Sequence, residues 1–124
     1  MLISCQSFGF RNGLPQDADL VFDVRCLPNP YYVPELKEHD GTEGPVRDYV
    51  MNAPESHEML QKLEELLAFS IPLYQREGKS QLVVAVGCTG GRHRSVAIAC
   101  QLAAYLRSLG YRVELSHRDK DNRR

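Results

Sequence analysis

The sequence predicts a single α/β domain: a three-layer arrangement with a small, largely parallel or mixed sheet of about four strands and flanking helices. A valine-rich apolar run at residues 81–86 is typical of a buried strand. A glycine-rich turn at residues 87–95 follows it, and residues 96–106 have the composition of a buried helix. Residues 111–115 alternate in polarity, so this strand–helix–strand unit predicts two parallel strands joined by a right-handed crossover. A length of 124 residues suits one domain spanning residues 1–124.

The N-terminal part of the chain predicts two strands and a rigid connection. Residues 2–8 alternate between apolar and polar side chains, which indicates a first strand. Glycine and proline within residues 9–15 indicate a loop. Residues 20–25 form a second strand whose apolar start favours burial on both faces of the sheet. The prolines within residues 27–34 exclude an α-helix there and predict an extended segment.

Two helices are expected before the valine-rich strand. Residues 39–45 are rich in glycine and acids and predict a loop, and residues 46–51 predict a short helix. Pro54 suits the first position of a longer helix, whose apolar side chains repeat on one face. Pro72 should kink or end that helix.

Composition and charge limit the classes of function. No apolar run is long enough to span a bilayer, and the N-terminus lacks the features of a signal peptide, so we expect a cytoplasmic protein without membrane partners. The four cysteines form no C-x-x-C pair, and we predict neither a metal site nor a cofactor. The net charge is −7 over residues 1–75 and +6 over residues 76–124. This asymmetry fits either a basic face that meets a polyanion or two segments that neutralise each other.

The turn between the valine-rich strand and its helix predicts an anion site, best suited to phosphate. Glycines let backbone N–H groups converge, and a helix N-terminus carries partial positive charge. Arginine guanidinium groups bind phosphate through paired donors. The candidate ligand residues in the turn are Thr89, Gly90, Gly91, Arg92, His93, Arg94 and Ser95.

A purely structural interpretation of the turn is the alternative, with Ser95 as a helix cap and the domain as an interaction module. It explains the glycines, but it does not explain three cationic or titratable residues at the start of a helix. Each positive charge there opposes the helix dipole by roughly 0.3–1 kcal/mol. A bound anion removes this conflict.

The same turn also has the C-x5-R-S spacing of cysteine-dependent phosphatases. In that interpretation Cys88 attacks the phosphate that the loop, Arg94 and Ser95 hold. The reaction also needs a general acid, for which Asp23 and Asp40 are candidates. The alternative is that Cys88 is a small residue at the end of a strand.

Three further groups of residues are candidates for binding. Asp23 and Arg25 follow a strand at the expected ligand-binding end of an α/β sheet, although they could equally pair with each other. Tyr31 and Tyr32 could stack on a sugar or base, or pack over the sheet edge. The tail fits either a solvated terminus or a nucleic-acid contact through His117, Arg118, Lys120, Arg123 and Arg124.

Several motifs together resemble one known family. They are residues 7–10, 13–15, 17–25, 27–32, 46–50, 87–96 and 117–119. In these motifs the sequence resembles the C-terminal domain of the RapZ/YvcJ family of bacterial RNase adapter proteins, over nearly the whole chain.

The resemblance implies a sensor rather than an enzyme. Family members join a P-loop, kinase-like domain to this C-terminal domain. In the enterobacterial member the C-terminal domain binds small regulatory RNA, glucosamine-6-phosphate is a ligand, and the protein presents RNA to the endonuclease RNase E. By this resemblance the turn residues line a sugar-phosphate pocket that Asp23, Arg25 and Asn29 close, and the basic tail contacts RNA. The resemblance also implies a homo-oligomer.

The sequence departs from the family pattern in three places. The 124 residues contain no G-x-x-x-x-G-K-[ST] motif, so the P-loop domain is not among them. Asp119 and Asp121 interrupt the basic tail. Residues 40–43 read Asp-Gly-Thr-Glu instead of Thr-Gly-x-Asp. We therefore expect phosphate binding to transfer from the family more securely than RNA binding.

Overall fold

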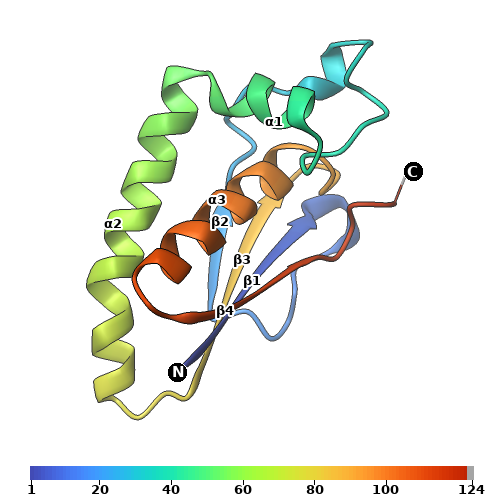
Figure 1. Ribbon diagram of the computed structural model, residues 1–124. Helices are drawn as coiled ribbons and strands as arrows, with labels where there is room; N and C mark the ends of the chain where they lie inside the picture. The colour runs from blue at the N-terminus through green and yellow to red at the C-terminus, as the bar shows by residue number, and fades with distance from the viewer. Residues whose placement is uncertain (123–124) are drawn as a thin grey trace.

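The computed structural model describes residues 1–122, and a four-stranded sheet forms its centre (Figure 1). The strands are β1 (Leu2–Gly9), β2 (Leu20–Asp23), β3 (Gln81–Cys88) and β4 (Arg112–His117), in the order β2-β3-β1-β4. All three neighbouring pairs are parallel, so the carboxyl ends of the strands share one edge of the sheet. The predicted α/β class is confirmed, and β1 lies between the two parallel strands of the predicted β3–α–β4 unit.

The α-helices within residues 1–122 are α1 (Gly44–Met51), α2 (Pro54–Arg76) and α3 (Arg94–Ser108). Figure 1 shows α3 lying across the sheet, with α2 beside it and α1 near its N-terminal end. The helix α3 packs on β1, β3 and β4, whereas α1 and α2 pack against α3. Phe8 lies near the carboxyl end of β1. The ring of Phe10, in the 3-10 turn after β1, packs on the ring of Phe8 and covers that face of the sheet there.

One apolar core joins the sheet to the helices. Alternate residues of β3, namely Leu82, Val84 and Val86, are fully buried in it. Opposite them, α3 contributes fully buried small side chains such as Ala97 and Ala99, which let the helix approach the strands closely. The core therefore fixes the start of α3 directly above the carboxyl ends of β1 and β3.

The structure corrects three details of the predicted elements. The strand β2 lies at the edge of the sheet, and Val21 is 41% exposed rather than buried. The helix α2 continues through Pro72 to its end at Arg76; since Pro72 is exposed, solvent can reach the carbonyl that lacks its N–H partner. A 3-10 turn at Pro30–Tyr32 interrupts the predicted extended segment.

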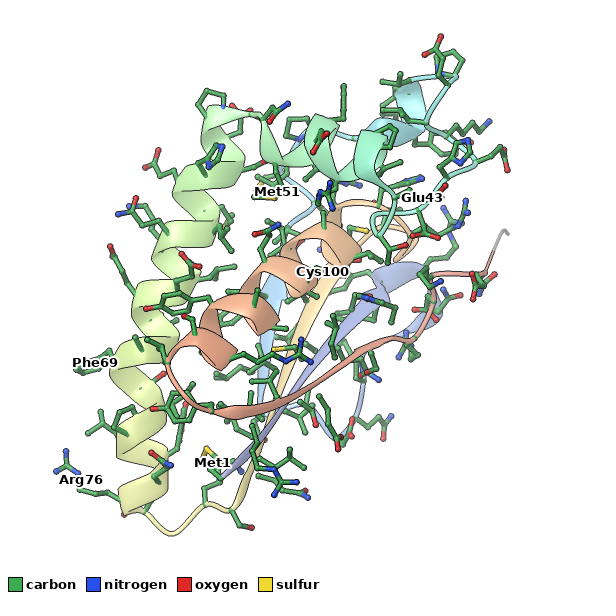
Figure 2. The ribbon with its side chains drawn as sticks, viewed as in Figure 1. Met1, Glu43, Met51, Phe69, Arg76 and Cys100 are labelled. Atoms are coloured by element: carbon green, nitrogen blue, oxygen red, sulfur yellow. The ribbon has the colours of Figure 1, made fainter. Side chains whose placement is uncertain are left out.

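Figure 2 shows Phe69 and Arg76 on α2, at the side of the molecule away from the sheet. Phe69 is 69% exposed there.

No helix within residues 1–122 combines the length and apolar character that crossing a bilayer requires.

Candidate functional site

The candidate site begins with the turn between β3 and α3. The strand ends at Cys88 and the helix starts at Arg94, which leaves five residues between them. His93 occupies the N-cap position, and its side chain makes no capping hydrogen bond. Ser95 does not act as a cap either, because its hydroxyl lies 3.2 Å from the Cys88 thiol in the interior. Neither His93 nor Ser95 therefore caps the positive end of α3.

Close approaches between backbones fix the shape of this turn. Gly91 has φ +81°, and a Cβ added to it would lie 2.5 Å from the nitrogen of Gly9. On the other side of the turn, the N–H of Gly41 donates to the carbonyl of Arg92 at 2.8 Å. A Cβ at Gly41 would lie 2.4 Å from the carbonyl oxygen of His93. Only glycine fits these two positions without displacing backbone.

Arg94 is the most unusual charged residue of the turn. Only 5% of it is exposed, although its guanidinium carries a full positive charge. One terminal nitrogen donates to the carbonyls of Arg25 and Leu27, and the other donates to the hydroxyl of Thr89 at 3.3 Å. Its Nε is buried and has no hydrogen-bond partner among the described residues. Burying a charge is costly, and the nearby Asp23 carboxylate interacts with Arg94 electrostatically but forms its ion pair with Arg25. Arg94 is therefore the strongest candidate of the turn for contact with an anion.

A cavity of about 540 Å³ opens beside Arg94. The turn contributes Cys88, Thr89, Gly90, Arg92, His93 and Arg94 to its lining. The remaining lining residues come from three other segments: Arg11, Asn29, Tyr31, Tyr32, Lys37, Glu38 and Asn122. Four of the lining residues are Arg or Lys and one is Glu, so the cavity has an excess of positive charge.

Arg92 and His93 line this cavity, but their side chains hold other segments of the chain. The guanidinium of Arg92 donates to the carbonyls of Glu38 at 3.0 Å and Lys120 at 2.9 Å. The imidazole Nε2 of His93 donates to the carbonyl of Lys37 at 3.0 Å. Sequence reasoning could not identify these roles, because the acceptors are backbone carbonyls of residues far away in the chain.

The predicted residues outside the turn have mixed positions. Asn29 lines the cavity, and its Oδ1 accepts a hydrogen bond from the N–H of Tyr31 at 3.1 Å. Asp23 and Arg25 pair with each other at 2.7 Å on the surface, which was the alternative considered for them, and neither lines the cavity. This hydrogen bond from Arg25 is the main cause that lowers the pKa of the Asp23 carboxyl.

The two tyrosines lie at the rim of the cavity rather than packed over the sheet. Tyr31 is 49% exposed and Tyr32 is 79% exposed. Their rings meet edge to face at 5.6 Å, and the Lys37 ammonium lies 4.6 Å from the Tyr31 ring centre. Their exposed faces are therefore available to a ligand in the cavity.

The residues predicted for the phosphatase reaction are only partly brought together. Cys88 and Arg94 line the same cavity, and Ser95 contacts the Cys88 thiol. The candidate acids do not line it: Asp23 pairs with Arg25, and Asp40 binds Thr42 and approaches Lys120 at 3.8 Å.

The described part of the basic tail makes intramolecular contacts. Arg118 binds the Asp119 carboxylate at 2.9 Å and the carbonyl of Gly13 at 2.6 Å. His117 turns inward: its Nδ1 lies 2.7 Å from the Ser7 hydroxyl. Lys120 is near Asp40, as noted above. Arg123 and Arg124 lie outside the described residues.

Four lining residues were not predicted: Arg11, Lys37, Glu38 and Asn122. Arg11 follows β1, and the N–H of its backbone donates to the carbonyl of Thr89 at 3.1 Å. Its position after a strand at the carboxyl edge was the one available signal. The other three residues lie in polar loop and tail segments whose sequence carries no such signal.

Two inward-facing histidines predict how stability depends on pH. Burial is the main cause that lowers the pKa of both His93 and His117; nearby cations, Arg92 for the first and Lys120 for the second, lower it further. Both side chains therefore resist protonation in the fold more than in the unfolded chain. Their stabilising contribution is complete above about pH 6.5 and is lost as the pH falls below that value.

We expect the free energy of unfolding to decrease between pH 7.5 and pH 5.5, by up to about 1.4 kcal/mol per pH unit for each histidine. Urea unfolding in phosphate-free buffer measures this change. The His93→Asn and His117→Asn variants should each show a shallower dependence than the wild type. Equal slopes in all three proteins would contradict this assignment.

Comparisons with known proteins agree with the sequence motifs. The family described as RapZ C-terminal domain matches residues 1–121. A nucleotide-binding protein of Alkaliphilus oremlandii is 59% identical over 98% of this chain and 42% of its own length. Nucleotide-binding proteins of Clostridium acetobutylicum and Geobacter sulfurreducens are each 54% identical, over 96% and 98% of this chain and 40% and 42% of theirs. The chain thus spans about two fifths of the length of these relatives.

Proposed function

The chain belongs to the RapZ C-terminal domain family, and we propose that it binds a phosphorylated small metabolite in the cavity beside the β3–α3 turn. The observation that carries this proposal is the buried guanidinium of Arg94, whose Nε lacks a partner among the described residues. A phosphate oxygen can accept this N–H while the uncapped start of α3 adds favourable dipole charge.

The size of the cavity favours a ligand larger than phosphate alone. Its volume of about 540 Å³ lies in the range of small-molecule sites. Thr89, Gly90 and Arg94 form its phosphate end, whereas Tyr31, Tyr32 and Asn29 offer ring faces and an amide to the rest of a ligand. A sugar phosphate meets both requirements. By family membership we propose an amino-sugar phosphate such as glucosamine-6-phosphate.

Binding of the proposed ligand should depend on its phosphate group. We expect glucosamine-6-phosphate to raise the melting temperature, because a ligand at 100 times its Kd adds about 2.7 kcal/mol to the stability of the folded state. Inorganic phosphate should give a smaller increase, and glucosamine should give none. Thermal unfolding with each compound at equal ionic strength measures the difference. Equal effects of glucosamine and its phosphate, or no effect of either, would contradict the proposal.

The family also underlies a proposed adapter role, in which the domain binds small regulatory RNA and presents it to an endoribonuclease. Of the predicted tail residues, His117 and Arg118 make contacts within the fold. Lys120 is partly exposed, with 30% of its side chain accessible, and remains a candidate for RNA contact. Self-association also stays a prediction from the family.

One observation favours a second candidate function, a cysteine-dependent phosphatase. The Cys88 thiol lies 3.2 Å from the Ser95 hydroxyl, and Cys88 lines the same cavity as Arg94. A hydroxyl at this distance can donate a hydrogen bond to the sulfur atom that would attack the phosphate. Inorganic phosphate released during incubation with glucosamine-6-phosphate, and lost in Cys88→Ser, would favour this function over sensing.

A further inference from the structure

The side chain of Arg92 joins two segments that are far apart in the sequence. Its Nη2 donates to the carbonyl of Glu38 at 3.0 Å, and its Nε donates to the carbonyl of Lys120 at 2.9 Å. Both acceptors are backbone atoms, so these bonds depend on where the two segments lie and not on which side chains they carry. Each bond is charge-assisted. Removing the guanidinium leaves both carbonyls without this donor and so weakens the attachment of both segments.

Further contacts tie the first of these segments to the turn. The N–H of Gly41 donates to the carbonyl of Arg92 at 2.8 Å. His93 binds the carbonyl of Lys37 at 3.0 Å. Residues 37–41 are thus fixed at their two ends by the backbone and side chains of the β3–α3 turn.

The tail has further anchors beside the turn, on β1 and on residues 37–41. The buried Asp119 carboxylate accepts the N–H of Gly9 at 2.7 Å, next to the close contact between Gly9 and Gly91. Lys120 approaches Asp40 at 3.8 Å, which links the tail to residues 37–41 a second time. Asn122 lines the cavity. The C-terminal tail is therefore part of the wall of the proposed ligand pocket.

We propose that Arg92 is a positioning residue that holds residues 37–41 and residues 118–122 in one arrangement around the pocket, so that pocket occupancy and tail position are coupled. This inference rests on the proposed function for its ligand. Lys37, Glu38 and Asn122 line the cavity from these two segments. A ligand that contacts both walls binds the arrangement held by Arg92 better than one in which either segment has moved away, and shifts the population towards it.

The coupling acts in both directions. Any partner that binds the tail and moves it away from Arg92 lowers the affinity of the pocket by the same factor by which the ligand opposes that partner. The anion contact itself stays with Arg94, which bonds neither segment. Arg92 and Arg94 therefore have separable roles: one positions the walls and the other binds the phosphate.

Hydrogen exchange of the whole chain, measured by mass spectrometry without ligand, tests whether Arg92 links residues 37–41 to residues 118–122. In Arg92→Ala we expect exchange to rise about tenfold in both residues 37–41 and residues 118–122, with β1 and β3 unchanged. Arg92→Lys keeps the charge but cannot reach both carbonyls with one ammonium, so it should loosen at least one segment. Arg112→Ala removes an exposed arginine from the opposite end of β4 and should change neither segment. Unchanged exchange in Arg92→Ala, or a change in one segment alone, would overturn the proposal.

Adding inorganic phosphate separates this inference from the proposed function. In the wild type, saturating phosphate should slow exchange in both segments together. In Arg92→Ala, phosphate should still protect the start of α3, because Arg94 is intact, but the joint response of the two segments should be lost. A joint response that persists in Arg92→Ala would overturn the coupling. No phosphate effect in the wild type would contradict the proposed function, while the ligand-free measurement would still decide whether Arg92 links the segments.

Discussion

Replacing Arg94 with alanine is expected to lower the affinity for a sugar phosphate by about a hundredfold or more. A hydrogen bond to a charged group contributes roughly 1.5–3 kcal/mol, and a guanidinium can offer phosphate two such bonds. Arg94 is positioned for this role by its burial and by the Nε that has no partner among the described residues. Calorimetric titration with glucosamine-6-phosphate measures the loss.

Two comparisons separate the loss of the anion contact from other effects of this change. Arg94 also holds the carbonyls of Arg25 and Leu27, so urea unfolding must show how much stability the alanine variant loses. Arg94→Lys retains the positive charge but lacks the paired N–H donors of the guanidinium. It should bind the sugar phosphate more weakly than the wild type but better than Arg94→Ala. Arg112→Ala removes the same charge far from the turn and should bind normally. Wild-type affinity in Arg94→Ala would rule out the assignment.

Replacing Gly91 with alanine is expected to cost about 2–5 kcal/mol of unfolding free energy. Its φ of +81° costs an L-residue roughly 1–2 kcal/mol. The added Cβ would also lie 2.5 Å from the Gly9 nitrogen and 2.7 Å from the Phe8 carbonyl carbon, so two backbone segments must separate. Overpacking of this kind costs a further 1–3 kcal/mol or more. Because the turn must move, phosphate binding should be lost as well.

Gly78 provides a matched control for this substitution. It has a similar φ of +91°, but a Cβ there would meet no atom within 4 Å. Gly78→Ala should therefore lose only the conformational part, about 1–2 kcal/mol, and keep phosphate binding. Urea unfolding of both variants isolates the cost of the contact. If the two variants lost the same free energy, the close approach of Gly91 to β1 would not be a determinant of the site.

Local sequence signals predicted the centre of the fold and of the site. The valine-rich strand, the glycine-rich turn and the small-residue helix that follows it depend on neighbours in the chain, and the structure contains all three as β3, the turn and α3. Arg94 was predicted as a ligand residue because cations at the start of a helix need an explanation, and that role stays a prediction. Its burial and its unpartnered Nε follow from packing against residues 25 and 27, which no local pattern reveals.

The other predictions failed or stayed open where long-range contacts decide. The apolar start of β2 does not show that this strand lies at the sheet edge, because strand order depends on the whole topology. The guanidinium of Arg92 donates to the carbonyls of residues 38 and 120, which no local pattern reveals, and its predicted contact with a ligand stays a prediction. Asp23 and Arg25 form an ion pair with each other. The sequence allowed this pairing but did not favour it over contact with a ligand.

The most direct test of the proposed phosphate site is the NMR resonance of the Arg94 Nε–H group during titration with glucosamine-6-phosphate. The structure leaves this donor buried and without a partner in the described residues. We expect a saturable downfield shift and slower exchange with water as a phosphate oxygen accepts the hydrogen bond, and no change with glucosamine. An Arg94 resonance that stays unchanged while the sugar phosphate binds would show that the phosphate lies elsewhere.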